Sequence, residues 1–219
     1  SFAELEWLPN RLAHCFRRAG LREGDTVAAN LENNEHVHAV MWAARRCGLY
    51  YALINTHLTP AEAAYIVDNS GAKALIGSRA TRTVCEGLAE HLPDGLPGLL
   101  LMADDDVDGW QRYPDCVTDE PSTPLSDEIE GDLLPSSSGT TGRPKGIRRE
   151  LTHVSPADAP AMLAPLFMAV GITGESVYLS PAPLYHTAPS FWSMTVQALG
   201  GTTVIMEKFG PEQALDAIQ

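Results

Sequence analysis

Apolar residues recur along the first part of the chain at two spacings, one typical of helices and one typical of strands. The helical spacing predicts a first helix that ends before Gly20, because its apolar positions lie three or four residues apart: Leu5, Leu8, Leu12, Phe16 and Ala19. The run TVAANL, residues 26–31, then predicts a buried strand. The same order repeats with a helical pattern at residues 35–48 and a strand pattern at residues 50–55.

This alternation of helix and strand continues to the end of the chain. Thr59, Pro60 and Glu62 predict an N-cap, a first turn and a capping box for a helix that ends near Gly71. Further strand patterns lie at residues 73–78, 98–103, 132–135, 176–180 and 202–206, and further helical patterns at 82–92, at 155–170, after Pro189 and from Pro211. Such alternation favours a layered α/β fold with a largely parallel sheet flanked by helices on both faces.

The composition fits a soluble domain with a packed core. The chain has 219 residues, of which 44% are hydrophobic, and that content is sufficient for one large domain or two small ones. No apolar run approaches the roughly 18 residues that would span a bilayer, and the first twenty residues are amphipathic, unlike a signal peptide. We therefore expect no transmembrane segment and a cytoplasmic location, while the oligomeric state stays open.

The charge is strongly negative and unevenly distributed. A formal net charge of −13 argues against nucleic acid and anionic lipid as partners. Eleven acidic residues and a single arginine lie between Ala103 and Asp132, so we expect residues 103–132 to be a solvated acidic linker. It would divide an α/β segment, residues 1–102, from a second segment, residues 133–219.

The cysteine pattern predicts neither a metal site nor a disulfide framework. The four cysteines lie more than about 30 residues apart, without a CxxC pair or a histidine at ligand spacing. We expect four scattered, reduced thiols.

A polar loop, SSSGTTGRPKG at residues 136–146, follows the strand pattern at 132–135 directly. Its glycines and proline exclude a core helix or strand, and consecutive Ser, Thr and Gly residues allow hydroxyls and backbone N–H groups to converge on an anion. Lys145 adds a positive charge suited to a phosphate oxygen. Ligands of parallel α/β folds bind at the carboxyl ends of strands, so this loop predicts a phosphate site.

The loop differs from other known phosphate-binding and catalytic patterns. It is not a Walker A loop, which requires G-x-x-x-x-G-K-[ST], and it does not match G-x-G-x-x-G. Neither G-x-S-x-G nor H-E-x-x-H occurs in the chain. The serines are therefore interpreted as phosphate ligands, not as nucleophiles.

The segment SSGTTGRPKG, residues 137–146, resembles the phosphate-binding signature of the adenylate-forming superfamily of acyl-CoA synthetases, luciferases and peptide-synthetase adenylation domains. PAPLYHTAP, residues 181–189, resembles its second signature beside the acyl pocket, and residues 50–76 are similar to a segment early in its large N-terminal domain. Where close relatives place Leu-Tyr before the Ser-Ser-Gly, this chain has Pro135 and Ser136. The resemblance covers nearly the whole chain in the same order.

The resemblance implies an enzyme that activates a carboxylate with ATP and Mg²⁺ as acyl-adenylate and then forms a thioester with coenzyme A. Lys145 and His186 would be catalytic, and Thr140 would meet Mg²⁺ through the phosphates. The implied nucleotide-binding residues are Ser137, Ser138, Gly139, Thr140, Thr141, Gly142 and Lys145.

The resemblance also implies that residues 1–219 are an incomplete N-terminal AMP-binding domain, since the adenine, ribose and Mg²⁺ segments and the C-terminal domain of the superfamily lie further along the chain. We expect this piece to be inactive or to bind nucleotide weakly.

The substrate is expected to be an apolar acyl group, such as a fatty acid, because four apolar side chains without a charge follow the second signature: Phe191, Trp192, Met194 and Val196. An amino-acid-activating adenylation domain and a non-catalytic phosphate-binding module remain alternatives. His186 could equally be a buried histidine with a backbone partner, and Tyr185 and Trp192 could be core residues.

Overall fold

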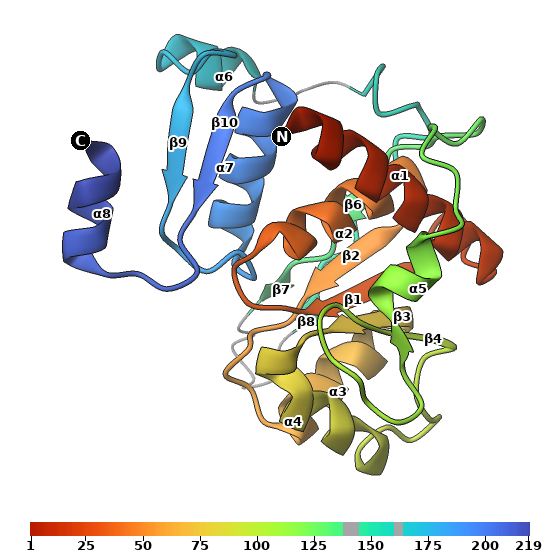
Figure 1. Cartoon of the computed structure of the whole chain (residues 1–219). Helices are drawn as coiled ribbons and strands as arrows, with labels where there is room; N and C mark the ends of the chain where they lie inside the picture. The colour runs from red at the N-terminus through yellow and green to blue at the C-terminus, as the bar shows by residue number, and fades with distance from the viewer. Residues whose placement is uncertain (138–144, 160–163) are drawn as a thin grey trace.

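The computed structural model describes residues 1–137, 145–159 and 164–219, and its centre is a six-stranded parallel sheet (Figure 1). The strand order is β5-β4-β3-β1-β2-β6, and every neighbouring pair is parallel. The strands are β1 (Thr26–Asn30), β2 (Tyr50–Leu53), β3 (Ala72–Gly77), β4 (Leu99–Met102), β5 (Gln111–Arg112) and β6 (Asp132–Leu133). The predicted parallel α/β architecture is confirmed.

Helices cover both faces of this sheet (Figure 1). One face packs against α1 (Phe2–Arg18), α2 (Glu35–Arg46) and α5 (Tyr113–Val117), and the other packs against α3 (Pro60–Ser70), beside which lie η1 (Arg79–Thr81), α4 (Arg82–Gly87) and η2 (Leu88–Glu90). Side chains alternate accordingly, because Val27 and Ala29 of β1 belong to the first core and Ala28 to the second.

The ends of α3 and α2 follow from their capping residues. Thr59 and Glu62 form the predicted capping box, and Gly71 closes α3 in the left-handed conformation with φ of 63°. Asn34 begins α2, since its side chain accepts hydrogen bonds from the backbone N–H groups of His36 and Val37.

A second, smaller unit contains two parallel strands, β9 (Val177–Ser180) and β10 (Thr202–Ile205). Between them the chain forms α7 (Thr187–Ala198), which lies on the side of the unit that faces α2, while α8 (Pro211–Ile218) lies on the opposite side (Figure 1). The helix expected at 155–170 is described only as α6 (Ala164–Ala169), and residues 155–159 form a turn instead.

Residues 103–132 differ from the solvated linker that their composition suggests. They contain β5 and α5, and Tyr113, Cys116 and Val117 lie in the core. Several acidic residues pair with arginines on α1, α2 and α4: Glu120 with Arg18, Glu128 with Arg46, Glu130 with Arg45 and Asp105 with Arg82. A count of charge within the segment cannot show these pairs, because most of the arginines lie far away in the sequence.

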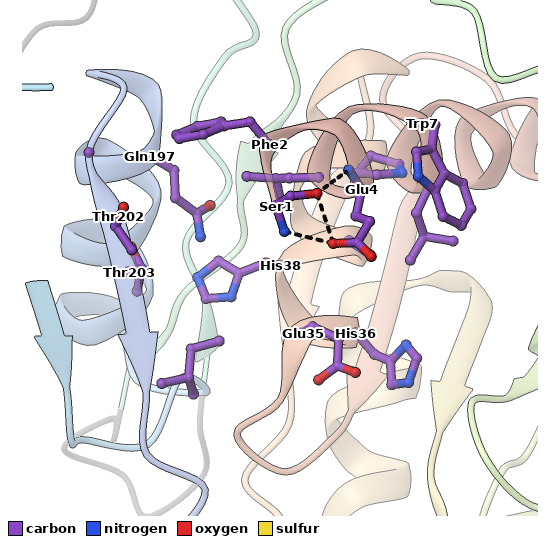
Figure 2. Close-up of a pocket in the computed structure, with 16 residues that line it drawn as sticks. Ser1, Phe2, Glu4, Trp7, Glu35, His36, His38, Gln197, Thr202 and Thr203 are labelled. Carbon is purple, nitrogen blue, oxygen red and sulfur yellow. Dashed lines mark hydrogen bonds and ion pairs between the residues drawn. The ribbon is translucent and has the colours of Figure 1, made fainter. Parts of the chain in front are cut away.

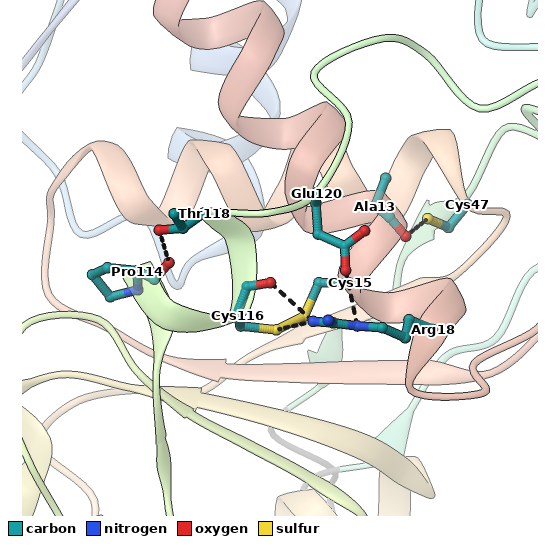
Figure 3. The surroundings of a disulfide bond; sticks show 8 residues. All are labelled: Ala13, Cys15, Arg18, Cys47, Pro114, Cys116, Thr118 and Glu120. Atoms are coloured by element: carbon teal, nitrogen blue, oxygen red, sulfur yellow. Dashed lines mark hydrogen bonds and ion pairs between the residues drawn. A yellow bond between two sulfur atoms is a disulfide. The ribbon is translucent and has the colours of Figure 1, made fainter.

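Two of the four cysteines form a disulfide, so the expectation of four reduced thiols is wrong. Cys15 of α1 and Cys116 of α5 are joined with 6.3 Å between their Cα atoms, although 101 positions separate them in the sequence (Figure 3). Packing of α5 on α1 brings the two cysteines together, and the spacing of cysteines in the sequence does not reveal this contact. Cys47 and Cys85 are free and buried, and burial raises their thiol pKa values to about 12 and about 11.

In the part of the chain that the structure describes, no helix is both long and apolar enough to cross a membrane.

Candidate functional site

The two ends of the predicted phosphate loop meet in a short antiparallel hairpin that follows β6. Its strands are β7 (Ser136–Ser137) and β8 (Lys145–Gly146), with Ser137 opposite Lys145. The other predicted ligands, Ser138, Gly139, Thr140, Thr141 and Gly142, lie outside the described residues, as does the predicted magnesium contact of Thr140. The backbone therefore brings the first and the last predicted ligand together.

Backbone and side-chain hydrogen bonds fix the base of this hairpin to the main sheet. Leu134 N–H donates to the Tyr51 carbonyl of β2 at 2.9 Å, and Ile147 N–H donates to the Pro135 carbonyl at 3.0 Å. From α3, the side-chain oxygen of Asn69 accepts from Gly146 N–H at 3.4 Å. The hairpin thus starts at the carboxyl end of a strand of the parallel sheet, where ligands of such folds bind.

Arg148 anchors the chain after the hairpin, a role that its position in the sequence does not reveal. Its guanidinium donates to the Gly24 carbonyl at 2.9 Å, to Thr26 Oγ1 at 3.0 Å and to the Ser70 carbonyl at 3.2 Å. It also stacks over the Tyr50 ring at 4.3 Å from the ring centroid. With its donors occupied in this way, Arg148 holds protein groups in place.

Arg149 is also paired with protein groups. It forms an ion pair with Asp132 at 2.7 Å, and its backbone carbonyl accepts a hydrogen bond from the Tyr50 hydroxyl. Both arginines that directly follow the hairpin, Arg148 and Arg149, therefore have structural partners.

His186 is exposed and begins α7 as its N-cap residue. Its ring lies 4.6 Å from the Tyr185 ring, and its backbone carbonyl accepts from Ser190 Oγ at 3.0 Å. The alternative of a buried core histidine is wrong for this residue. An exposed imidazole at the start of a helix is accessible to a ligand.

The four apolar residues of α7 divide between surface and core. Phe191 and Trp192 are each 38% exposed and pack against Phe167 of α6, with ring centroids 6.1 and 4.3 Å away. Met194 and Val196 are 4% and 0% exposed, so in the described chain these two side chains lie in the interior. Phe191 and Met194 are three positions apart and Trp192 and Val196 four, so each exposed residue shares a side of α7 with a buried one, and exposure changes along the helix.

A cavity of about 540 Å³ lies between the first turns of α1, the start of α2 and β10. Figure 2 shows Thr202, Thr203 and Gln197 on one side of it and Ser1, Glu4 and Trp7 on the other. His186 is not among the described residues that line it, so this cavity is separate from the predicted site.

One wall of the cavity includes His38, whose side chain is buried and neutral at pH 7. Its Nε2 lies 2.9 Å from Ser193 Oγ, and Ser193 Oγ donates to the Ser190 carbonyl. Nε2 therefore donates to Ser193, because the hydroxyl proton is already used. Burial lowers the His38 pKa to about 4.

This lowered pKa predicts a loss of stability on acidification. Below its ordinary pKa of 6.5 the unfolded chain binds a proton at His38, while the folded chain stays neutral until about pH 4. Stability should fall by about 3 kcal/mol across this window and be fully present above it. Unfolding midpoints measured from pH 7 to pH 4 should show this fall, and His38→Gln should show a smaller one. Parallel pH profiles for the two proteins would contradict the assignment.

Among the described residues, no group of three or more His, Cys, Asp or Glu side chains could hold a metal ion.

The chain is similar to known proteins in sequence and in fold. The family model for AMP-binding enzymes matches residues 1–219. A fatty acid–[acyl-carrier-protein] ligase, ScoC of Streptomyces coeruleorubidus, is 26% identical over 222 residues, covering 100% of this chain and 41% of that protein. A long-chain-fatty-acid–CoA ligase, FadD13 of Mycobacterium tuberculosis, is 28% identical over 209 residues, covering 94% of this chain and 39% of that protein.

A solved structure is similar over the whole chain. ATP-bound MatB from Rhodopseudomonas palustris has a TM-score of 0.76 and 25% identity, covering 100% of this chain and 42% of that chain. The chain thus spans about two fifths of the length of the curated relatives it matches.

Proposed function

This chain belongs to the AMP-binding enzyme family, whose relatives include acyl-CoA and fatty acid ligases, and we propose that the whole protein is an AMP-forming acid–thiol ligase for a fatty acid. The observation that carries the proposal is the β7–β8 hairpin, which brings Ser137 and Lys145 together directly after a strand of the parallel sheet. We further propose that Ser137–Gly142 and Lys145 contact the phosphates of ATP, and that His186 contacts the carboxylate and acyl group.

In the proposed reaction a carboxylate oxygen attacks the α-phosphorus of ATP, and the bond to the bridging oxygen breaks to release pyrophosphate. The thiol sulfur of coenzyme A then attacks the acyl carbon and AMP leaves. Charge builds up on the departing pyrophosphate, so preorganised donors and a fixed positive charge accelerate the first step. Lys145 and the N–H and hydroxyl groups of the loop supply these donors.

Mg²⁺ fits this proposal as a companion of the nucleotide. It keeps waters and phosphate oxygens as most of its ligands and needs few from protein. Thr140 would meet the ion through the phosphates, and the ion would neutralise phosphate charge.

A fatty acyl substrate is supported by two relatives that are named as fatty acid ligases and by the exposed aromatic pair Phe191 and Trp192 on α7. The first of these relatives is named for an acyl-carrier-protein acceptor and the second for CoA. We propose coenzyme A for this protein, in fatty acid metabolism, and place it in the cytoplasm.

The proposal is tested by incubating the whole protein with ATP, Mg²⁺, coenzyme A and a series of carboxylates. Saturated fatty acids should give AMP and acyl-CoA in equal amounts, while amino acids should give neither. Amino acid-dependent AMP formation would favour an adenylation domain. No AMP with any carboxylate would contradict the proposed activity and favour a phosphate-binding module.

The 219-residue chain alone should not turn over. Binding energy spread over a whole nucleotide cannot be recovered from its phosphate end, and the entropic cost of fixing ATP remains. We expect a Kd for Mg-ATP of about 1 mM or weaker by calorimetry. Micromolar binding of Mg-ATP together with acyl-CoA formation would mean that the 219-residue chain carries a complete site.

A further inference from the structure

Asn33 occupies the turn between β1 and α2 and is 9% exposed. Its amide reaches the second unit of the chain. Nδ2 donates to the Ala182 carbonyl at 2.9 Å and to the Met206 carbonyl at 3.0 Å, and Oδ1 accepts from Leu184 N–H at 2.7 Å. One side chain thus satisfies three backbone groups that lie more than 140 positions away in the sequence.

These three backbone groups belong to two segments that meet at the carboxyl ends of strands. Ala182 and Leu184 lie in the connection from β9 to α7, and Met206 follows β10. Asn33 itself follows the carboxyl end of β1, a central strand of the main sheet. The asparagine therefore ties the ends of both sheets together.

We infer that Asn33 is a positioning residue for His186, because it fixes the backbone of residues 182–184 immediately before Tyr185 and His186. The role in catalysis rests on the proposed function. Leu184 is buried at 1% exposure, and α7 begins three residues after it, at Thr187. Two hydrogen bonds of Asn33, to the Ala182 carbonyl and from Leu184 N–H, fix this short connection. The connection in turn sets the direction in which the His186 imidazole leaves the backbone.

The body of α7 is held separately. His38 contacts Ser193, and Trp42 Nε1 donates to Gln197 Oε1 at 2.8 Å, so α2 grips the middle and the end of the helix. Removing the Asn33 amide should therefore leave α7 packed while its entry segment shifts. A buried backbone N–H and two carbonyls would lose their partner, and the segment must move to regain hydrogen bonds.

The chemistry of the contact requires an amide. An aspartate would keep the acceptor for Leu184 N–H, but it would place a carboxylate oxygen against two carbonyl oxygens. The neighbouring Asn34 offers a matched control, because its side chain serves only the first turn of α2, accepting from His36 N–H at 3.0 Å and from Val37 N–H at 3.4 Å.

The test compares Asn33→Ala with Asn34→Ala by two measurements. In the whole protein, Asn33→Ala should lower kcat for carboxylate-dependent ATP–pyrophosphate exchange about tenfold or more, with the KM for ATP within about twofold. Asn34→Ala, which weakens the α2 cap, should leave kcat within about twofold. Equal losses of kcat in the two variants would overturn the inference, because they would report general destabilisation.

The second measurement does not depend on activity. In the 219-residue chain, the imidazole C–H resonances of His186, assigned with His186→Gln, should shift in Asn33→Ala and stay in place in Asn34→Ala. Unchanged His186 resonances in Asn33→Ala overturn the positioning role even if the enzyme is active. If the His186 resonances shift in Asn33→Ala but the whole wild-type protein has no activity, the positioning role is supported and the proposed function is refuted.

Discussion

Replacing Lys145 with alanine in the whole protein should lower the rate of carboxylate-dependent adenylation about 10²- to 10³-fold. The lysine lies at the end of the loop that the β7–β8 hairpin closes, and we propose that its charge acts on phosphate. The loss corresponds to about 3–4 kcal/mol of transition-state stabilisation. ATP–pyrophosphate exchange measures it, and the affinity for the acyl substrate should change little.

Lys73→Ala is the matched control for this variant. Lys73 is the second residue of β3 and lies at the amino-terminal end of the parallel sheet, whereas the loop follows the carboxyl end of β6. On the surface it pairs with Asp25 at 2.8 Å. The Lys73→Ala substitution removes the same single positive charge from the protein and leaves the loop unchanged. If both variants exchange at the wild-type rate, Lys145 does not act on the phosphates.

Reduction of the Cys15–Cys116 disulfide should lower the free energy of unfolding by about 4 kcal/mol, since the bond closes a long loop in the unfolded chain. The two residues are 101 positions apart. Loss of the bond also removes the covalent link between α1 and α5. The contacts that remain near it include the hydrogen bond from Arg18 to the Cys116 carbonyl and the ion pair of Arg18 with Glu120 (Figure 3). Chemical unfolding of the 219-residue chain with and without dithiothreitol measures the change.

The control is the double variant Cys15→Ser and Cys116→Ser, which should unfold like the reduced chain and not respond to dithiothreitol. Cys47 and Cys85 should not exchange into the bond, because both are buried and their raised pKa values leave few thiolates at pH 7. An oxidised wild type no more stable than the double variant would contradict the expected effect.

Local signals in the sequence predict the elements of this fold well. The capping box at Thr59, the left-handed Gly71 and the strand run that became β1 act through neighbours in the chain, so periodicity and capping chemistry reveal them. The alternation of these elements was sufficient to predict the parallel sheet, because such connections favour parallel strands.

Contacts between distant segments were not predicted. The disulfide, the ion pairs of residues 103–132 and the bonds of Asn33 and Arg148 all join residues tens of positions apart or more. Composition alone predicts that the acidic segment of residues 103–132 is solvated. Only the fold brings their partners within reach, so these roles need coordinates.

The candidate site was predicted in part. The hairpin that joins Ser137 and Lys145 and the exposed position of His186 agree with a ligand site, whereas Met194 and Val196 belong to the core. Amino-acid type identifies an apolar residue, but the packing of α7 against its neighbours decides whether that residue meets a ligand or the interior.

Exchange of labelled pyrophosphate into ATP by the whole wild-type protein tests the proposed chemistry most directly. If the loop of residues 137–145 supports formation of an acyl-adenylate, exchange should require the carboxylate and Mg²⁺ and proceed without coenzyme A. Exchange that needs coenzyme A, or hydrolysis of ATP to ADP and phosphate in place of exchange, would contradict an adenylate intermediate.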